Sequence, residues 1–153
     1  MRLLVDCHCF DYPTPQGINT YLRGLYGSLI YKTTNIEFFL TANNLNNLKN
    51  IFGERENITY LRIPAKGSLS RLLSIFPSLI KENRIDVAHF QYVAPFIKNC
   101  KTIVTLHDIL FKDFPQYFPI GYRITKNILF KYTAKRADIL LTVSEYSKKQ
   151  IAK

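Results

Sequence analysis

The sequence predicts an α/β protein of the Rossmann-like, doubly wound type, with a mainly parallel sheet and helices on both faces. Short apolar, β-branched segments alternate with longer segments of helical periodicity from one end of the chain to the other. Strands separated by helices are typical of a parallel sheet, because each helix forms the crossover between neighbouring strands. The length of 153 residues suits one domain, and the hydrophobic fraction of 47% is ample for a packed core.

The first half of the chain follows this alternation closely. Residues 2–7 are apolar enough for a buried first strand, and the loop FDYPTPQG ends that strand with its prolines and glycine. A helix is expected next, because apolar side chains recur at helical spacing at Ile18, Tyr21, Leu22, Leu25 and Leu29. We expect the second strand at 35–43, a short helix at 43–52 and the third strand at 57–63.

The second half repeats the pattern. An apolar face within about 120° of a helical wheel predicts a helix packed on the sheet; it consists of Leu69, Leu72, Leu73, Phe76, Leu79 and Ile80. Pro77 must kink this helix or start a new turn, because it has no backbone N–H. Ser144 is placed to cap the last helix, and Glu145 favours its positive end. The other expected elements are strands at 86–90, 100–106 and 137–143 and a helix at 119–137.

Composition narrows the functional classes. The net charge of +10 points to an anionic partner, unless it serves solubility alone. Three cysteines without framework spacing argue against a disulfide scaffold, and neither a signal peptide nor a membrane span is apparent. We therefore expect a cytoplasmic protein, with peripheral attachment to the inner face of a membrane as a further option. Specific nucleic-acid binding is not expected, because no recognition module accompanies the charge.

Polar residues stand where such sheets bind ligands, at the carboxyl ends of the strands. After the first strand, Gly17 and Asn19 open a helix whose free N–H groups and dipole favour a phosphate. One glycine does not make the dinucleotide fingerprint, which needs three. The alternative is a loop glycine that is needed only for its backbone angles.

Two further strand ends carry histidines. His89 and Gln91 share a direction by strand alternation, and the alternative for His89 is a half-buried histidine bonded to a neighbour. His107 and Asp108 directly follow the fifth strand. A histidine in that position is suited to donate hydrogen bonds to a substrate or to carry positive charge.

Two more motifs receive structural interpretations. Alternation separates His8 from Cys7 and Cys9, and no second ligand pair exists at metal spacing, so we expect buried or loop-lining thiols without a metal. The segment 123–136 places basic residues among apolar ones, which suits a helix pressed on anionic lipid; they are Arg123, Lys126, Lys131, Lys135 and Arg136. On a helical wheel they scatter, so a solvated face is the favoured interpretation.

Four segments, in order along nearly the whole chain, resemble those of family 4 glycosyltransferases. PQGINTYLRGL resembles the family's glycine loop and first helix, and RIDVAHFQY resembles its Asp-Val-(Val/Ala)-His strand. The more specific segments are TIVTLHDILFKDFPQYF, like the family's Thr-hydrophobic-His-Asp segment, and ADILLTVSEYSKKQI, like its Val-Ser-Glu-(Phe/Tyr)-Ser-Lys segment. In the first loop, where many members have two glycines, this chain has Gln16 before Gly17.

The resemblance implies the N-terminal, acceptor-side half of an enzyme with the GT-B architecture, in which two Rossmann-like halves face each other across a cleft. Residues 1–153 would form this domain, and a C-terminal donor-binding domain would lie outside them. Members of the family use a nucleotide-sugar donor, retain the anomeric configuration and need no metal. No cofactor is therefore expected.

The resemblance also assigns residues by position. Gly17, with Asn19 beside it, would lie next to the donor diphosphate or the reacting sugar, and His107 would be the catalytic histidine that reaches the donor sugar. His89, Gln91 and Asp108 would lie on the acceptor side.

We therefore expect the full-length protein to transfer a sugar from a nucleotide sugar to a glycan or lipid-linked acceptor in polysaccharide biosynthesis. The isolated domain is expected to be inactive, because it lacks the donor half. The alternative is a non-catalytic Rossmann-like module that binds a partner subunit or a membrane surface in a split transferase.

Overall fold

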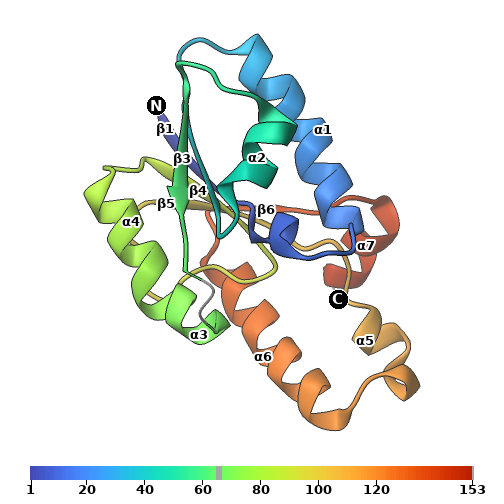
Figure 1. The fold of residues 1–153 in the computed structure, drawn as a ribbon. Helices are drawn as coiled ribbons and strands as arrows, with labels where there is room; N and C mark the ends of the chain where they lie inside the picture. The colour runs from blue at the N-terminus through green and yellow to red at the C-terminus, as the bar shows by residue number, and fades with distance from the viewer. Residues whose placement is uncertain (65–66, 153) are drawn as a thin grey trace. The chain divides into compact units, whose positions relative to one another are not determined.

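The computed structural model describes residues 1–64 and 67–152, and in this part of the chain six strands form one sheet (Figure 1). The strands are β1 (Arg2–Asp6), β2 (Glu37–Ala42), β3 (Ile58–Arg62), β4 (Val87–Gln91), β5 (Lys101–Thr105) and β6 (Ile139–Leu141). The α-helices are α1 (Gly17–Lys32), α2 (Leu45–Phe52), α3 (Ser68–Ser70), α4 (Phe76–Glu82), α5 (Leu110–Asp113), α6 (Ile120–Arg136) and α7 (Glu145–Ile151). Shorter turns are η1 (His8–Asp11), η2 (Arg71–Ile75) and η3 (Pro115–Tyr117).

The strand order β3-β2-β1-β4-β5-β6 confirms the predicted Rossmann-like fold. Strand β1 pairs in parallel with β2 and with β4, and parallel pairing also joins β2 to β3 and β5 to β6. The order reverses between β1 and β4. In doubly wound sheets, ligands bind outside the carboxyl ends of the strands at such a reversal.

The chain forms two compact units, which are described separately below. Unit 1 contains residues 1–89 and 95–101, and unit 2 contains residues 90–94 and 102–153. The candidate residues are divided between them, since Gly17, Asn19 and His89 belong to unit 1 and Gln91, His107 and Asp108 to unit 2.

Unit 1 buries both faces of its strands. Figure 1 shows α1 and α2 on one side of β1 and β2, and α4 on the other side. The side chains that pack between the strands and α1 and α2 include Val5, Cys7, Leu22, Tyr26, Leu40, Leu48 and Phe52. On the opposite face, Leu4 and Phe39 of the strands and Phe76 and Ile80 of α4 are all buried. Nearly continuous apolar strands of this kind are typical of parallel sheets covered on both faces.

In the helical segment before β4, only part of the apolar face predicted from Leu69 to Ile80 is buried. Phe76 and Ile80 are buried as expected, but Leu69 and Leu73 are 62% and 46% exposed. The reason is η2, a π-helical turn that precedes Pro77 and shifts the earlier residues off the 100° period. Pro77 lies in the first turn of α4, directly after η2, so the helix changes from π to α geometry where a kink or a new turn was predicted.

Candidate functional site

His107 lies directly beyond β5 in unit 2. The strand hydrogen bonding continues one residue past β5, because the Leu106 N–H donates to the Leu141 carbonyl at 2.9 Å. His107 then follows with only 9% of its surface exposed. The predicted position at the carboxyl end of a buried strand is therefore confirmed.

Gln91 holds the imidazole of His107. The Nε2 atom of His107 lies 2.8 Å from Oε1 of Gln91, and both side chains are buried. An amide oxygen only accepts hydrogen bonds, so Nε2 carries the proton in this pair. Burial lowers the pKa of His107 below its ordinary value near 6.5, although the charge of Asp108 acts in the opposite direction. The ring is accordingly neutral at pH 7 and is oriented by Gln91.

Tyr92 is a site residue that the sequence analysis missed. Its ring stacks on Phe130 at 5.1 Å between centroids and lies 5.4 Å from the His107 ring. Its backbone has φ = 63°, a left-handed conformation that costs a bulky residue about 1–3 kcal/mol. The only signal in the sequence was an aromatic residue directly after the strand residue Gln91. A strained backbone of this kind persists only where the surrounding packing holds it in place. Here it places the aromatic ring of Tyr92 beside His107.

Asp108 ties the same group of residues to the following loop. Its Oδ2 atom accepts a hydrogen bond from the Tyr92 hydroxyl at 3.2 Å, and its Oδ1 atom accepts one from the Leu110 N–H at 3.3 Å. Burial, followed by the charge of Asp108, raises the pKa of Tyr92 above its ordinary value, so the phenol stays protonated as the donor. Asp108 thus orients the loop after β5. Its contact with an acceptor stays a prediction.

Helix α7 supports the backbone at His107. The Ser144 hydroxyl accepts a hydrogen bond from the Ser147 N–H at 3.1 Å, which confirms the predicted cap. The Ser147 hydroxyl in turn donates to the carbonyl of His107 at 2.9 Å. Ser147 is buried, and sequence reasoning assigned it no role. The two most specific sequence segments, around His107 and around Ser144, are therefore joined by a hydrogen bond.

The start of α1 forms the second candidate site, in unit 1. Gln16 and Asn19 form a reciprocal cap, in which the Gln16 N–H donates to Asn19 Oδ1 at 2.9 Å. The Asn19 amide also donates to the Cys9 carbonyl at 3.2 Å. Asn19 is buried and holds the loop, and its predicted proximity to the donor stays a prediction.

Gly17 stands at the first position of α1 without a structural need for glycine. Its φ lies outside the left-handed region, and a Cβ built on it would meet no atom of the described chain within 4 Å. The alternative interpretation, a glycine required for its backbone angles, is therefore not supported. A glycine that neither the backbone angle nor the packing requires leaves room for a ligand to approach the helix N-terminus closely.

A comparison with protein families identifies the family of this chain. The sequence model of Glycosyltransferase Family 4 matches residues 15–153, from the loop before Gly17 to the end of the chain. This chain belongs to glycosyltransferase family 4. Among curated proteins, no relative matches the sequence.

His89 occupies a different environment from the other candidates of this family 4 domain. It is 1% exposed, and its Nδ1 atom lies 2.6 Å from the hydroxyl of Tyr26 on α1. The Tyr21 and Tyr26 rings also contact it, at 6.4 and 5.8 Å between centroids. This geometry matches the alternative interpretation, a buried histidine bonded to a neighbour. That His89 lies near an acceptor stays a prediction. It would influence an acceptor through Tyr26, by fixing the position of α1.

Cys7 and Cys9 of the family 4 domain are buried thiols, one of the two predicted alternatives, whereas Cys100 is partly exposed. Cys7 and Cys9 are 0% and 3% exposed at the start of η1. Burial, with the charge of nearby Asp6, raises the pKa of Cys9 to about 12, and burial also raises that of Cys7. Both thiols therefore stay protonated, while His8 pairs with Asp6 at 2.8 Å.

Proposed function

We propose that this chain is the acceptor-side half of a retaining glycosyltransferase. The enzyme transfers a sugar from a nucleotide sugar to a glycan or lipid-linked acceptor in polysaccharide biosynthesis. Membership of family 4 supports the reaction class. The observation that carries the proposal is the support of His107, whose ring is held by Gln91 and whose carbonyl is held by Ser147.

The helix start at Gly17 is suited to the charge that develops during transfer. Departure of a nucleoside diphosphate builds negative charge on oxygen, and helix N-termini stabilise such charge through free N–H groups and the helix dipole. Within the described residues, the N–H groups of Gly17 and Ile18 have no acceptor, whereas Asn19 N–H bonds to the Gln16 carbonyl. We therefore assign Gly17 to the donor diphosphate.

His107 is assigned to the donor sugar as a neutral, positioned imidazole. A histidine that is already held in one orientation can hydrogen-bond and position the hydroxyls of the sugar. Little entropy is then lost when the reaction takes place, because the imidazole is ordered beforehand. Its burial argues against a permanent positive charge, which would oppose the cation that develops on the reacting sugar. The donor itself is bound mainly by a second Rossmann-like half outside these residues, and no metal takes part.

A transfer assay tests this proposal. The full-length protein is incubated with a panel of nucleotide sugars and with glycan or lipid-linked acceptors, and nucleoside diphosphate release is measured. Product NMR reports the anomeric configuration. We expect transfer with retention by the full-length protein and none by residues 1–153 alone. Inversion, or robust transfer by residues 1–153, would contradict the proposal.

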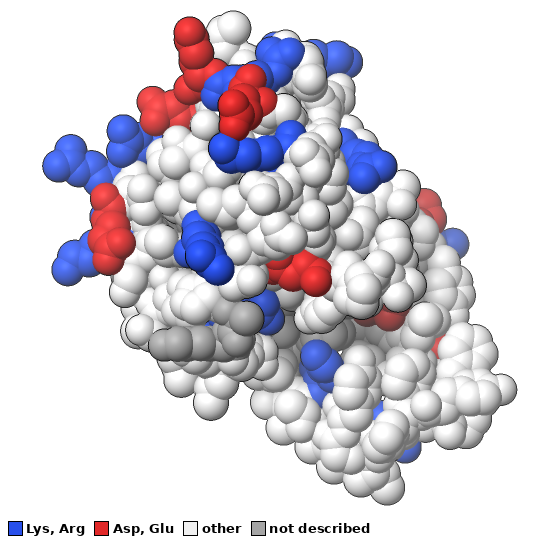
Figure 2. Space-filling model, viewed as in Figure 1, with Lys and Arg blue, Asp and Glu red and all other residues white. Residues whose placement is uncertain are grey.

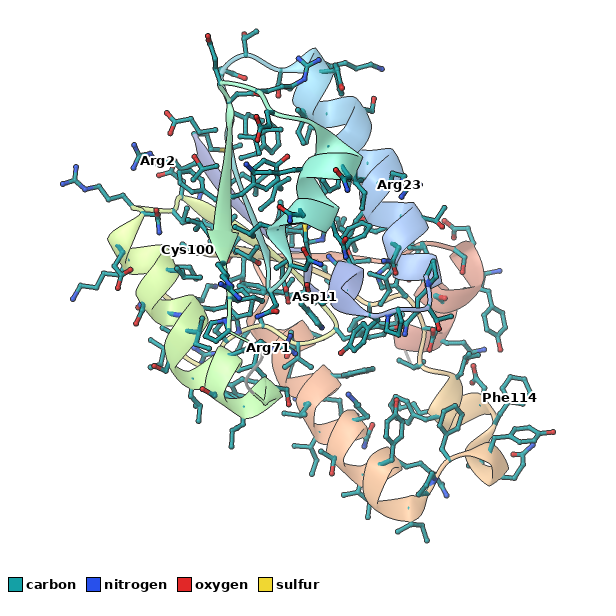
Figure 3. The ribbon with its side chains drawn as sticks, in the orientation of Figure 1. Arg2, Asp11, Arg23, Arg71, Cys100 and Phe114 are labelled. Carbon is teal, nitrogen blue, oxygen red and sulfur yellow. The ribbon has the colours of Figure 1, made fainter. Side chains whose placement is uncertain are left out.

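The surface of α6 favours a peripheral contact with a membrane as part of this function. Ile120, Ile124 and Ile128 recur every four residues on α6 and are 70%, 58% and 62% exposed. In the view of Figure 2, few charged side chains are seen in the region where α5 and the first half of α6 lie in Figure 1. Figure 3 shows the exposed Phe114 at the end of α5, directed away from the ribbon. An apolar surface of this kind on a domain marks an interaction site.

Basic side chains accompany this apolar stripe. Lys126 lies over the rings of Tyr122 and Phe130, at 5.5 and 5.7 Å from their centroids, and Arg136 lies 5.3 Å from that of Tyr132. Aromatic, aliphatic and basic groups together suit the interface of an anionic membrane. Arg123, Lys131 and Lys135 lie on the same helix. We place the enzyme in the cytoplasm, at the inner face of the membrane.

Vesicle binding tests this part of the proposal. Full-length protein should sediment with vesicles that contain anionic phosphatidylglycerol, and less with purely zwitterionic vesicles. The double variant Ile124→Ser/Ile128→Ser should lose most of this binding, whereas Tyr31→Ser, an exposed aromatic change on α1, should not. Equal sedimentation of all three proteins would remove α6 from the proposal. Within residues 1–64 and 67–152, none of the helices has the length and hydropathy of a bilayer span.

A further inference from the structure

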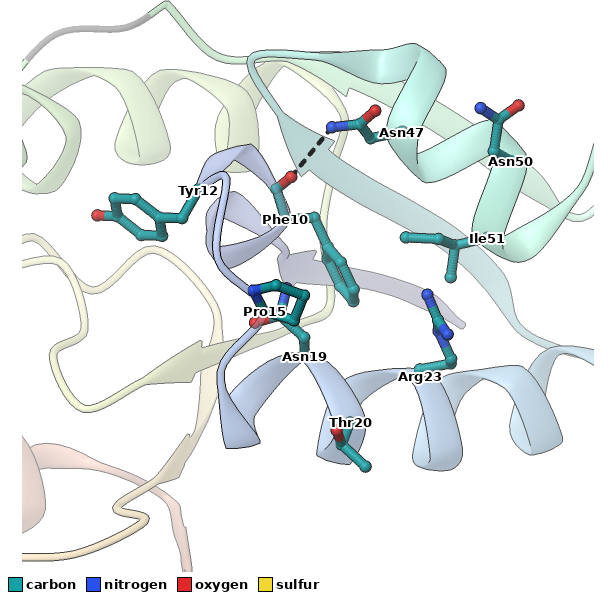
Figure 4. Close-up of a pocket in the computed structure, with 9 residues that line it drawn as sticks. All are labelled: Phe10, Tyr12, Pro15, Asn19, Thr20, Arg23, Asn47, Asn50 and Ile51. Atoms are coloured by element: carbon teal, nitrogen blue, oxygen red, sulfur yellow. Dashed lines mark hydrogen bonds between the residues drawn. The ribbon is translucent and has the colours of Figure 1, made fainter.

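A groove in unit 1 lies between the loop after β1 and the helices α1 and α2 (Figure 4). Its volume of about 380 Å³ falls in the range of small-molecule pockets. Phe10, Tyr12 and Pro15 come from the loop region, Arg23 from α1, and Asn47, Asn50 and Ile51 from α2. Asn19 and Thr20 of α1 also line it, so the groove adjoins the candidate site at the start of α1.

The apolar part of the groove has one fixed and one open ring. Phe10 is 6% exposed and packs edge-on against Phe52 at 5.9 Å, so it forms a rigid floor. Tyr12 is 51% exposed at the rim. Figure 4 shows the Tyr12 ring directed away from α1 and α2, so Phe10 is the aromatic surface between these helices.

The polar part of the groove combines one cation with amides. Within the described residues, the guanidinium of Arg23 has no hydrogen-bond or ion-pair partner, and Figure 4 shows it reaching from α1 towards Ile51. Asn50 has no partner there either. Asn47 donates to the Phe10 carbonyl at 3.2 Å, so its amide oxygen remains available as an acceptor. The groove therefore offers both donors and acceptors, as sugar hydroxyls require.

The charge of Arg23 is not neutralised inside the groove. No carboxylate is among the residues that line it. Asp11, on the neighbouring η1 turn, already accepts hydrogen bonds from the N–H groups of Asn43 and Asn44, at 2.9 and 2.8 Å. A planar guanidinium prefers carboxylates and phosphates, with which it forms two parallel hydrogen bonds.

We propose that this groove binds an acidic saccharide, a sugar unit that carries a carboxylate or a phosphate. The inference rests on the proposed function, because it makes the groove a subsite for the acceptor glycan. Arg23 binds the anionic group, and Asn47 and Asn50 bind hydroxyls. The net charge of +10 favours the approach of such an acceptor.

Calorimetric titration of the full-length protein tests the groove without any transfer reaction. The probes are tetragalacturonate, mannose 6-phosphate and neutral maltotetraose, which separate a carboxylate, a phosphate and an uncharged glycan. We expect at least one acidic probe to bind more tightly than maltotetraose. Arg23→Gln should weaken that binding at least 10-fold, and Lys32→Gln, the loss of an exposed cation at the other end of α1, should leave it unchanged.

The outcomes separate the groove from the proposed function. Equal binding of all three probes, no binding, or an equal loss in both variants would overturn the acidic-saccharide assignment. Thermal unfolding of each variant excludes a folding defect. Asn50→Ala, an exposed change on α2, is titrated in the same way as a second variant of the groove. If Arg23-dependent binding persists in a protein that transfers no sugar, the groove stands and the proposed function fails.

Discussion

The two candidate sites of this family 4 domain use different parts of the chain, because one depends on the backbone at Gly17 and the other on the side chain of His107. In unit 1, the side chain of Asn19 at the start of α1 bonds to neighbouring backbone groups, and a Cβ built on Gly17 would meet no described atom within 4 Å. In unit 2, a side chain, His107, is held by other side chains, Gln91 and Ser147. The first site should therefore be sensitive to added bulk, and the second to lost hydrogen bonds.

The largest effect is expected at His107. His107→Ala in the full-length enzyme should lower turnover about 100-fold or more, because the sugar loses its positioning group. Nucleoside diphosphate release measures this effect, and thermal unfolding checks that the variant folds. Turnover near that of the wild type would remove His107 from the site.

A smaller loss is expected at Gln91, which acts through His107. Gln91→Leu keeps the approximate volume but leaves the Nε2–H of His107 without its acceptor, at a cost of about 1–3 kcal/mol in stability. Turnover should fall about 10-fold, and the ¹⁵N NMR shifts of the His107 ring should show a changed tautomer population. If the tautomer is unchanged, Gln91 does not orient the ring.

At Gly17 the test adds a side-chain atom, whereas the variants of His107 and Gln91 remove hydrogen-bonding groups. Gly17→Ala should leave stability unchanged or slightly higher, since the Cβ meets no atom, yet it should lower turnover several-fold by obstructing the phosphate. Gly24→Ala is the matched control on the exposed side of α1. It should stabilise the protein by about 0.5–1 kcal/mol without changing turnover. Equal turnover in the two variants would mean that no ligand approaches Gly17.

The smallest effect is expected in the pH dependence of folding stability, and it concerns His107 in unit 2. The folded state lowers the pKa of His107 below 6.5, so the unfolded chain binds more protons as the pH falls. The stability contributed by neutral His107 is present above about pH 6.5 and is lost as the pH falls through the folded pKa. The decrease in melting temperature from pH 7 to pH 5 should therefore be smaller in His107→Gln. An identical decrease in both proteins would mean that His107 is not buried in its neutral form.

Local patterns in the sequence predicted the elements well, and tertiary packing explains where they misled. The strand ends and the Ser144 cap follow from short-range periodicity and capping chemistry. The apolar face from Leu69 to Ile80 was only half right, because the π-turn η2 changes the helical period before Pro77. A pattern based on 100° per residue contains no sign of such a turn.

The sequence by itself determined the fold class, the family and the position of His107 at the end of a buried strand. These depend on the order of apolar and polar residues along the chain, which sets backbone periodicity. Only the tertiary structure decided which groups hold that histidine. Gln91 and Ser147 lie 16 and 40 residues from His107, and Tyr92 reaches it through a strained backbone. Such partners meet only when strands and helices distant in sequence pack together.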